Sequence, residues 1–291
     1  MTPVDRLDAM RRILVAMDAS QGSLSALETA TALAELVQAE LEGIFIEDAD
    51  LIALADLPFS REVRLAGGSV QALDLTALEG ELRMQAMAAR RAMQRAAARR
   101  RLPWTFRSVR GSVISELAAA AREVDILCIG RRGQSPLRTA RLGNTIRAAL
   151  RSARVVLVAG TGGLALTGPV AVVVGPTGLT EPALRFATVV AEKTGQPLLI
   201  YVTGSDMRAI EVQQRQVEGM LPEGRPVRFR SIDTAHMPLL FDTLRAERQG
   251  LVICGAKRED GQLEWLERLV DSVHCPVLVF NAEAAEPEKT A

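Results

Sequence analysis

Short aliphatic segments alternate with longer amphipathic segments along the whole chain. The short runs have the length of buried β-strands, whereas the longer stretches place apolar residues at helical spacing. This alternation predicts βαβ units, and such units build a parallel sheet with right-handed crossovers. The first series of expected strands comprises Ile13–Met17, Leu41–Ile46, Trp104–Val109, Ile126–Ile129 and Val155–Ala159.

The same order of segments then repeats. ILVAMDASQGSLSAL (Ile13 to Leu27) aligns with VAVVVGPTGLTEPAL (Val170 to Leu184), DILCIG (Asp125 to Gly130) with GLVICG (Gly250 to Gly255), and ARVVLV (Ala153 to Val158) with HCPVLV (His274 to Val279). Three matching blocks in one order indicate a duplication. We therefore expect an α/β protein with a first domain at 1–160 and a second at 168–282, followed by a disordered tail at 283–291.

The two copies differ in length because the first carries an extra stretch at about residues 47–76. Stretches this long inside compact domains act as lids or binding segments, or cover their own domain. We expect a surface cover. The strands VVLV (Val155–Val158) and VLVF (Val277–Phe280) could pair with each other as a pseudo-dimer within one chain, which would remove two exposed sheet edges. Alternatively, each strand ends its own sheet.

Composition narrows the class of protein. With 35 basic and 35 acidic side chains, no general attraction to nucleic acid or to an anionic membrane is expected. No segment has the about 20 apolar residues of a membrane span, and residues 1–12 lack the apolar core of a secretory signal. The three cysteines are far apart among aliphatic residues, which favours reduced thiols and a cytoplasmic location. With two histidines, a multi-histidine metal site is excluded.

The segment GRRGQSPLRTARLGNTIRAAL is the strongest candidate for a binding site. Gly130, Gly133 and Gly143 would let the backbone approach an anion closely, and Asn144 and Thr145 would open a helix whose free N–H groups favour negative charge. The loop is also basic, with arginines at Arg131, Arg132, Arg138 and Arg141. The alternative is a plain connection that Asn144 caps, with solvated arginines. The chain contains no P-loop motif G-x-x-x-x-G-K-[ST], and no dinucleotide fingerprint G-x-G-x-x-G follows its first strand.

The first-strand sequence ILVAMDASQGS and the spacing G-x2-G-x9-G followed by a polar pair resemble the universal stress protein family, and the tandem arrangement resembles its two-domain members. The resemblance implies two flavodoxin-like domains, each a five-stranded, mainly parallel sheet with helices on both faces. It also implies ATP or AMP as ligand, with or without Mg²⁺. By the same resemblance, the nucleotide would contact Asp18, the backbone of Ile46, Ile129 with Gly130, and a phosphate cradle of Gly133, Gly143, Asn144 and Thr145. Arg131 and Arg132 join this set through their charge.

Two departures from the family pattern are visible: Asn144 stands where Ser or Thr is usual, and Ala19 replaces the common glycine after Asp18. On residue chemistry alone, Asp18 could instead cap the following helix. In the second copy, Gly175 takes the place of Asp18, and the loop from Ala256 to Leu269 loses the glycine spacing and gains acidic residues. We therefore interpret the second copy as degenerate.

These observations favour a nucleotide-binding regulatory protein of the stress response, with the nucleotide in the first domain only and an unidentified protein partner. A scaffold without nucleotide and a slow ATP hydrolase are the alternatives. The loop from Gly130 to Thr145 contains no acidic residue, and both histidines lie in the second copy, so no catalytic residue is assigned. The sequence leaves open whether the whole chain forms a homodimer.

Overall fold

The computed structural model describes residues 10–57, 61–63, 70–72, 74–131, 144–160, 167–175, 179–222, 226–234, 237–256 and 260–281. The first half contains β1 (Arg12–Met17), α1 (Gln21–Val37), β2 (Glu40–Asp48), α2 (Ala49–Ala55), β3 (Arg61–Val63), β4 (Val70–Ala72), α3 (Leu75–Arg100), β5 (Trp104–Gly111), α4 (Val113–Ala121), β6 (Ile126–Ile129), α5 (Asn144–Ser152) and β7 (Val155–Val158). The second half contains β8 (Val170–Val174), α6 (Glu181–Thr194), β9 (Leu198–Gly204), α7 (Met207–Met220), β10 (Val227–Asp233), α8 (Met237–Ala246), β11 (Leu251–Ala256), α9 (Asp260–Ser272) and β12 (Val277–Asn281).

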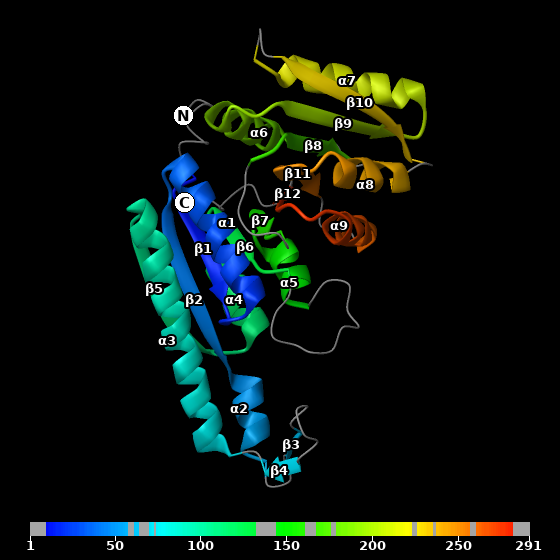
Figure 1. Ribbon diagram of the computed structural model, residues 1–291. Coiled ribbons are helices and arrows are strands. Elements are labelled where there is room, and N and C mark those ends of the chain that lie inside the picture. Colours follow the sequence, from blue (N-terminus) through cyan, green and yellow to red (C-terminus); the bar gives the residue numbers. More distant parts are fainter. Residues whose placement is uncertain are drawn as a thin grey trace, which may run out of the picture.

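One ten-stranded sheet runs through both halves in the order β10-β9-β8-β11-β12-β7-β6-β1-β2-β5 (Figure 1). Neighbouring strands of this sheet are parallel, except that β7 and β12 pair antiparallel, from Val155↔Phe280 to Val158↔Val277. The predicted pairing of these two strands is therefore present. We call the contact along β7 and β12 the seam.

The core lies in two layers, one on each face of the sheet. One layer contains buried residues of α1, α3, α6 and α7, and the other contains those of α4, α5, α8 and α9. Every residue of β6, β7, β8 and β11 is buried. These strands are buried on both faces, which explains why they appear in the sequence as continuous aliphatic runs without alternation.

The predicted pair of five-stranded α/β arrangements with helices on both faces is confirmed, in the orders β5-β2-β1-β6-β7 and β10-β9-β8-β11-β12. Counted in chain order within each half, both are 3-2-1-4-5, so the order reverses between the first and fourth strands. The edge strands supply a further match between the halves, because β5 and β10 both contain Phe-Arg-Ser. Phe106 lies opposite Gly43, and Phe229 lies opposite Ile200. Gly43 and Ile200 hold the same place relative to β1 and β8.

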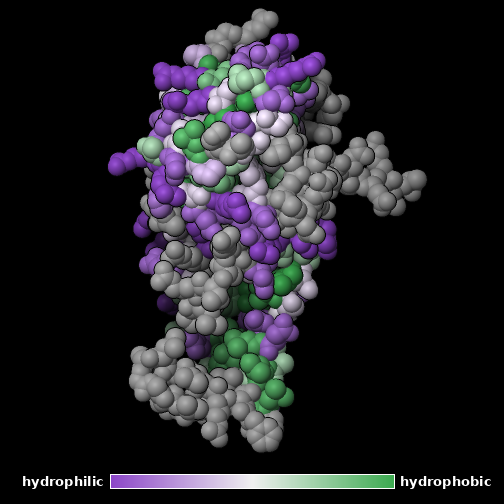
Figure 2. All heavy atoms as spheres, turned by 90° about the vertical axis from the view of Figure 1, so that its right-hand side faces the viewer, coloured by the Kyte–Doolittle hydropathy of each residue, from purple (hydrophilic) through white to green (hydrophobic). Residues whose placement is uncertain are grey.

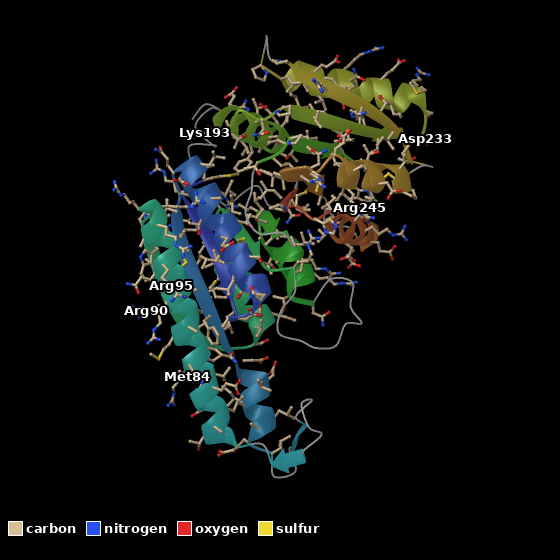
Figure 3. All side chains as sticks on the ribbon, viewed as in Figure 1. Met84, Arg90, Arg95, Lys193, Asp233 and Arg245 are labelled. Carbon is tan, nitrogen blue, oxygen red and sulfur yellow. The ribbon has the colours of Figure 1, made fainter. Side chains whose placement is uncertain are left out.

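The described residues of the extra stretch in the first half form an arm. Helix α2 and strands β3 and β4 extend beyond the end of the sheet, and the first part of α3 runs alongside them (Figure 1). Ile52 packs against the core and Ala55 is buried, so α2 covers part of its own half. Apolar surface gathers over this end in Figure 2, where the exposed large apolar residues of the arm are Leu51, Leu54 and Leu57, with Met84 and Met87 on α3 (Met84 is labelled in Figure 3).

Hydrogen bonds add to the strand pairing at the seam. The side-chain amide of Asn281 donates to the carbonyl oxygens of Leu150, at 2.8 Å, and Ala153. Away from the seam, the ammonium of Lys193 on α6 donates to Leu36 O at 2.7 Å, which connects α6 to the end of α1.

In the part of the chain that the structure covers, no helix is both long and apolar enough to cross a membrane. The predicted disordered tail at 283–291 lies outside the described residues.

Candidate functional site

The first half changes direction between β1 and β6. From β1 the chain moves outward through β2 to β5, and then returns to the other side of β1 to form β6 and β7. The helices between the outward strands, α1 and α3, pack on one face, while α4 and α5 pack on the other. The loops after β1 and β6 therefore diverge, and a crevice forms at the carboxyl ends of the strands, where ligands bind in open α/β sheets.

A cavity of about 310 Å³ lies at this point. Its walls are mostly apolar, and its polar side chains come from several elements. The lining consists of Ala16, Met17, Asp18, Ser20, Ser23, Ile44, Phe45, Ile46, Asp48, Leu82, Gln85, Val113, Leu117, Ile129, Gly130, Arg131, Thr145 and Ile146. An apolar slot with a few polar groups is the usual form of a small-molecule site.

Asp18 has a structural role in addition to its position in the cavity wall. Its Oδ1 accepts a hydrogen bond from Ser20 N at 3.0 Å, which closes the turn after β1. Ser20 is the N-cap of α1, and its hydroxyl accepts from Ser23 N at 3.1 Å. Between them, Ala19 has a φ of 58°, in the left-handed region. This conformation is the physical reason why a glycine would suit position 19.

Gly130 is required by packing. A Cβ on this residue would lie 2.4 Å from the carbonyl carbon and 2.5 Å from the carbonyl oxygen of Gly22, in the first turn of α1. The end of β6 therefore approaches the start of α1 so closely that only glycine fits. This contact brings the walls formed by Ser20 and Ser23 next to Gly130, and so shapes the cavity.

Arg131 lines the cavity, but its guanidinium reaches across the seam. Nη1 donates to Val273 O, and Nη2 donates to Cys275 O at 3.1 Å. Burial raises the pKa of the nearby Cys275 thiol to about 11, while the positive charge of Arg131 acts in the opposite direction. The arginine that sequence analysis assigned to the nucleotide thus connects the candidate site with the second half.

Six of the ten predicted site residues line the cavity. They are Asp18, Ile46, Ile129, Gly130, Arg131 and Thr145. Asn144 does not: it is the first residue of α5 and lies on a neighbouring groove with Arg147 and Arg151. Arg132, Gly133 and Gly143 lie outside the described residues.

Sequence reasoning missed the contributions of α3 and of Asp48, the last residue of β2. Leu82 and Gln85 form part of the wall because α3 packs over the ends of the strands. Asp48 also lines the cavity, and its carboxylate caps α2 by accepting from Asp50 N at 3.0 Å. An acidic residue at a strand end was the available signal for Asp48, whereas nothing in the pattern of α3 distinguishes Gln85.

The second half has different side chains at the corresponding positions. Strand register places Tyr201 where Ile44 stands and Thr203 where Ile46 stands. Tyr201 is fully buried, and Thr203 donates its hydroxyl to Val174 O at 3.0 Å. A Cβ on Gly175, the counterpart of Asp18, would lie 3.5 Å from the indole of Trp265. The indole of Trp265 therefore lies beside the position in the second half that corresponds to Asp18 in the cavity wall of the first half.

Fold and cavity together define an α/β protein with a cavity at the switch point of its first half. Residues 10–159 match the model of the universal stress protein family. Since this match spans just over half of the 291 residues, the chain belongs to the universal stress protein family.

Solved structures show the same fold over almost the whole chain. A universal stress protein from Archaeoglobus fulgidus DSM 4304 superposes with a TM-score of 0.69 at 17% identity, covering 94% of this chain and 98% of that one. A second solved structure, from Pseudomonas aeruginosa UCBPP-PA14, superposes with a TM-score of 0.54 at 16% identity, covering 95% of each chain.

A universal stress protein in complex with cAMP superposes on 52% of this chain and 98% of its own, with a TM-score of 0.37 at 22% identity. Among curated proteins, none matches the sequence significantly.

Proposed function

We propose that the protein binds an adenine nucleotide, ATP or AMP, in the cavity of its first half. The observation that carries this proposal is the convergence of Asp18, Ile46, Ile129 and Thr145 on one cavity at the switch point. Its volume, about 310 Å³, lies within the range of about 300 to 1,000 Å³ that is usual for ligand sites.

The lining supports a division of roles along the cavity. Apolar side chains such as Ile46, Leu117 and Ile129 suit a planar base, and the carboxylate of Asp18 suits ribose hydroxyl groups. Thr145, in the first turn of α5, suits a phosphate because the N–H groups of a helix start favour anions. The roles of Arg132, Gly133, Gly143 and Asn144, and of Mg²⁺, stay predictions.

Binding in the first half only is part of the proposal. It is supported by Gly175 in place of Asp18 and by the indole of Trp265 beside Gly175. A nucleotide in the second half would have no carboxylate at this position and would have to displace the indole. The regulatory role in a stress response, the protein partner and the cytoplasmic location are proposed on family membership and the free cysteines.

Calorimetric titration of ATP and AMP into the wild type and Asp18→Asn tests the proposal. Asparagine can still accept the hydrogen bond from Ser20 N, so the turn survives while the charge is lost. Hydrogen bonds to charged groups contribute about 1.5–3 kcal/mol, so we expect Kd for ATP to rise about 10- to 100-fold.

Asp206→Asn is the matched control. Asp206 caps α7 of the second half by accepting from Ala209 N at 2.8 Å, and it lies outside the cavity lining. We expect this variant to bind ATP like the wild type. If the wild type binds neither nucleotide at millimolar concentration, the protein is better described as a scaffold. Equal affinities for wild type and Asp18→Asn would show that the site assignment is wrong.

A further inference from the structure

We propose that the second half acts as a brace for the candidate nucleotide cavity, with Arg131 and Arg147 as positioning residues. The brace consists of two contacts across the seam: Arg131 with the carbonyl groups of Val273 and Cys275, and Arg147 with Glu267. This inference rests on the proposed function and deepens it, because it makes nucleotide affinity depend on a half that does not hold the nucleotide.

The first contact fixes the wall that follows β6. Gly130 packs against the main chain of Gly22 on one side, and the next residue, Arg131, is anchored to the second half on the other. Both residues line the cavity. The main chain at the end of β6 is therefore held between α1 and the segment that precedes β12.

One acceptor for Arg131, Val273 O, directly follows the last residue of α9, and the other, Cys275 O, lies two residues further along the chain. This helix ends at Ser272, and its last turn has no basic residue of its own. The carboxyl end of a helix carries partial negative charge and unsatisfied carbonyl groups, which favour a cation. Two arginines from other elements meet this need: Arg131 from the first half, and Arg245 of α8, whose Nε donates to Ser272 O at 3.0 Å (Figure 3). Arg131 therefore connects α9 to the cavity wall.

The second contact fixes the wall formed by α5. Arg147 Nη2 lies 2.6 Å from Glu267 Oε1. The side chain of Glu267 is only 7% exposed, so its carboxylate depends strongly on this partner. Arg147 directly follows Thr145 and Ile146, which line the cavity. Loss of this ion pair would leave a buried charge on α9 and release the first turn of α5.

Together the two contacts place the brace at two separate walls of one cavity. A ligand that requires both walls in position binds more tightly when the seam is intact. By thermodynamic reciprocity, the same ligand must stabilise the seam. The expected signature is therefore a response to nucleotide in the second half, at residues 265–281, which do not line the cavity.

The first experiment measures the affinity of Arg147→Ala and Arg147→Lys for ATP and adenosine by calorimetry. We expect Arg147→Ala to raise Kd about 3- to 10-fold for both ligands, although Arg147 does not line the cavity. Arg147→Lys keeps a cation for Glu267 and should restore most of the affinity. Arg215→Ala is the control, because Arg215 pairs with Glu211 on the exposed surface of α7.

Arg131→Lys separates bracing from direct contact with phosphate. Lysine keeps the positive charge but lacks the fork that reaches two carbonyl groups. A brace predicts that adenosine and ATP lose affinity by the same factor. A direct phosphate contact predicts a weakening for ATP alone, and that result would overturn the role of Arg131 as a positioning residue.

Hydrogen exchange supplies the decisive readout. In the wild type, ATP should slow amide exchange in peptides covering residues 265–281, and Arg131→Lys should reduce this protection at saturating ATP. If the wild type binds ATP without protecting this segment, and Arg147→Ala binds ATP normally, the brace is refuted while the proposed function stands. If the wild type does not bind ATP or adenosine, the proposed function itself fails.

Discussion

The contact between β6 and α1 makes Gly130→Ala an informative substitution. The new Cβ would lie 2.4 Å from the carbonyl carbon of Gly22 and 2.8 Å from Ser23 N. Ordinary contacts begin near 3.4 Å, so β6 and α1 must separate by about 1 Å. The atoms involved are main chain and cannot rotate away. Overpacking of a core costs about 1–3 kcal/mol, and we expect the upper end of that range.

For a domain of 150–250 residues, a loss of about 3 kcal/mol corresponds to a fall in Tm of about 6–12 °C. Differential scanning fluorimetry and urea denaturation of the purified variant measure the change. Gly80→Ala is the control, because Gly80 lies within α3 and a Cβ there meets nothing within 4 Å. Alanine in a helix is favoured over glycine, so this variant should gain about 0.5–1 kcal/mol. If Gly130→Ala unfolds like the wild type, steric exclusion is not the reason for glycine at position 130.

Three further substitutions or conditions test the packing. Burial raises the pKa of the cysteine thiols, to about 12 for Cys254 and about 11 for Cys275, so the unfolded chain loses these protons first as the pH rises. The contribution of these thiols to the free energy of unfolding should be at its full value below about pH 8.5. Above that pH, the free energy of unfolding should fall by about 1.4 kcal/mol per pH unit for each thiol, and a flat profile in urea titrations up to pH 10 would contradict this. Tyr201→Phe removes the hydroxyl that bonds to Glu247 and Gln249 and should cost about 1–2 kcal/mol in chemical denaturation, whereas an unchanged midpoint would show that the hydroxyl adds nothing. Asn281→Ala removes the side-chain amide from the seam and should cost about 1–2 kcal/mol, and no change in the urea midpoint would rule out a stabilising role for that amide.

Much of the fold follows from local sequence patterns. The predicted strand Ile126–Ile129 coincides with β6, and the predicted strand Ile13–Met17 matches β1 except that β1 begins one residue earlier, at Arg12. Both are short aliphatic runs between longer helical segments, and this difference in length, more than periodicity, identifies them as strands. The arm was not predicted in detail, because α2 is only 7 residues long and β3 and β4 have 3 residues each. Segments of this size depend on tertiary contacts more than on periodicity.

The candidate site was harder to derive than the fold. Sequence spacing identified Gly130 but could not give the reason for it, since close approach of a phosphate and close approach of a helix both require a residue without Cβ. The same limit applies to Arg131, because a basic side chain suits a phosphate and the carboxyl end of a helix equally well. Gln85 lies on the face of α3 that meets the strand ends, and that face is known only once the helix is docked.

The seam also constrains how the chain must be made. Strand β7 ends at Val158, and its partner β12 begins at Val277, so about 120 residues separate them. At about 5–20 residues per second, a ribosome needs roughly 6 to 24 seconds to synthesise that interval. Throughout this time the first half presents an apolar strand edge, Val155–Val158, with no partner in its own chain. Such an edge pairs readily with the same edge on a neighbouring nascent chain. Translation that pauses within the second half therefore favours swapped dimers over the native sheet, and prompt synthesis protects against them.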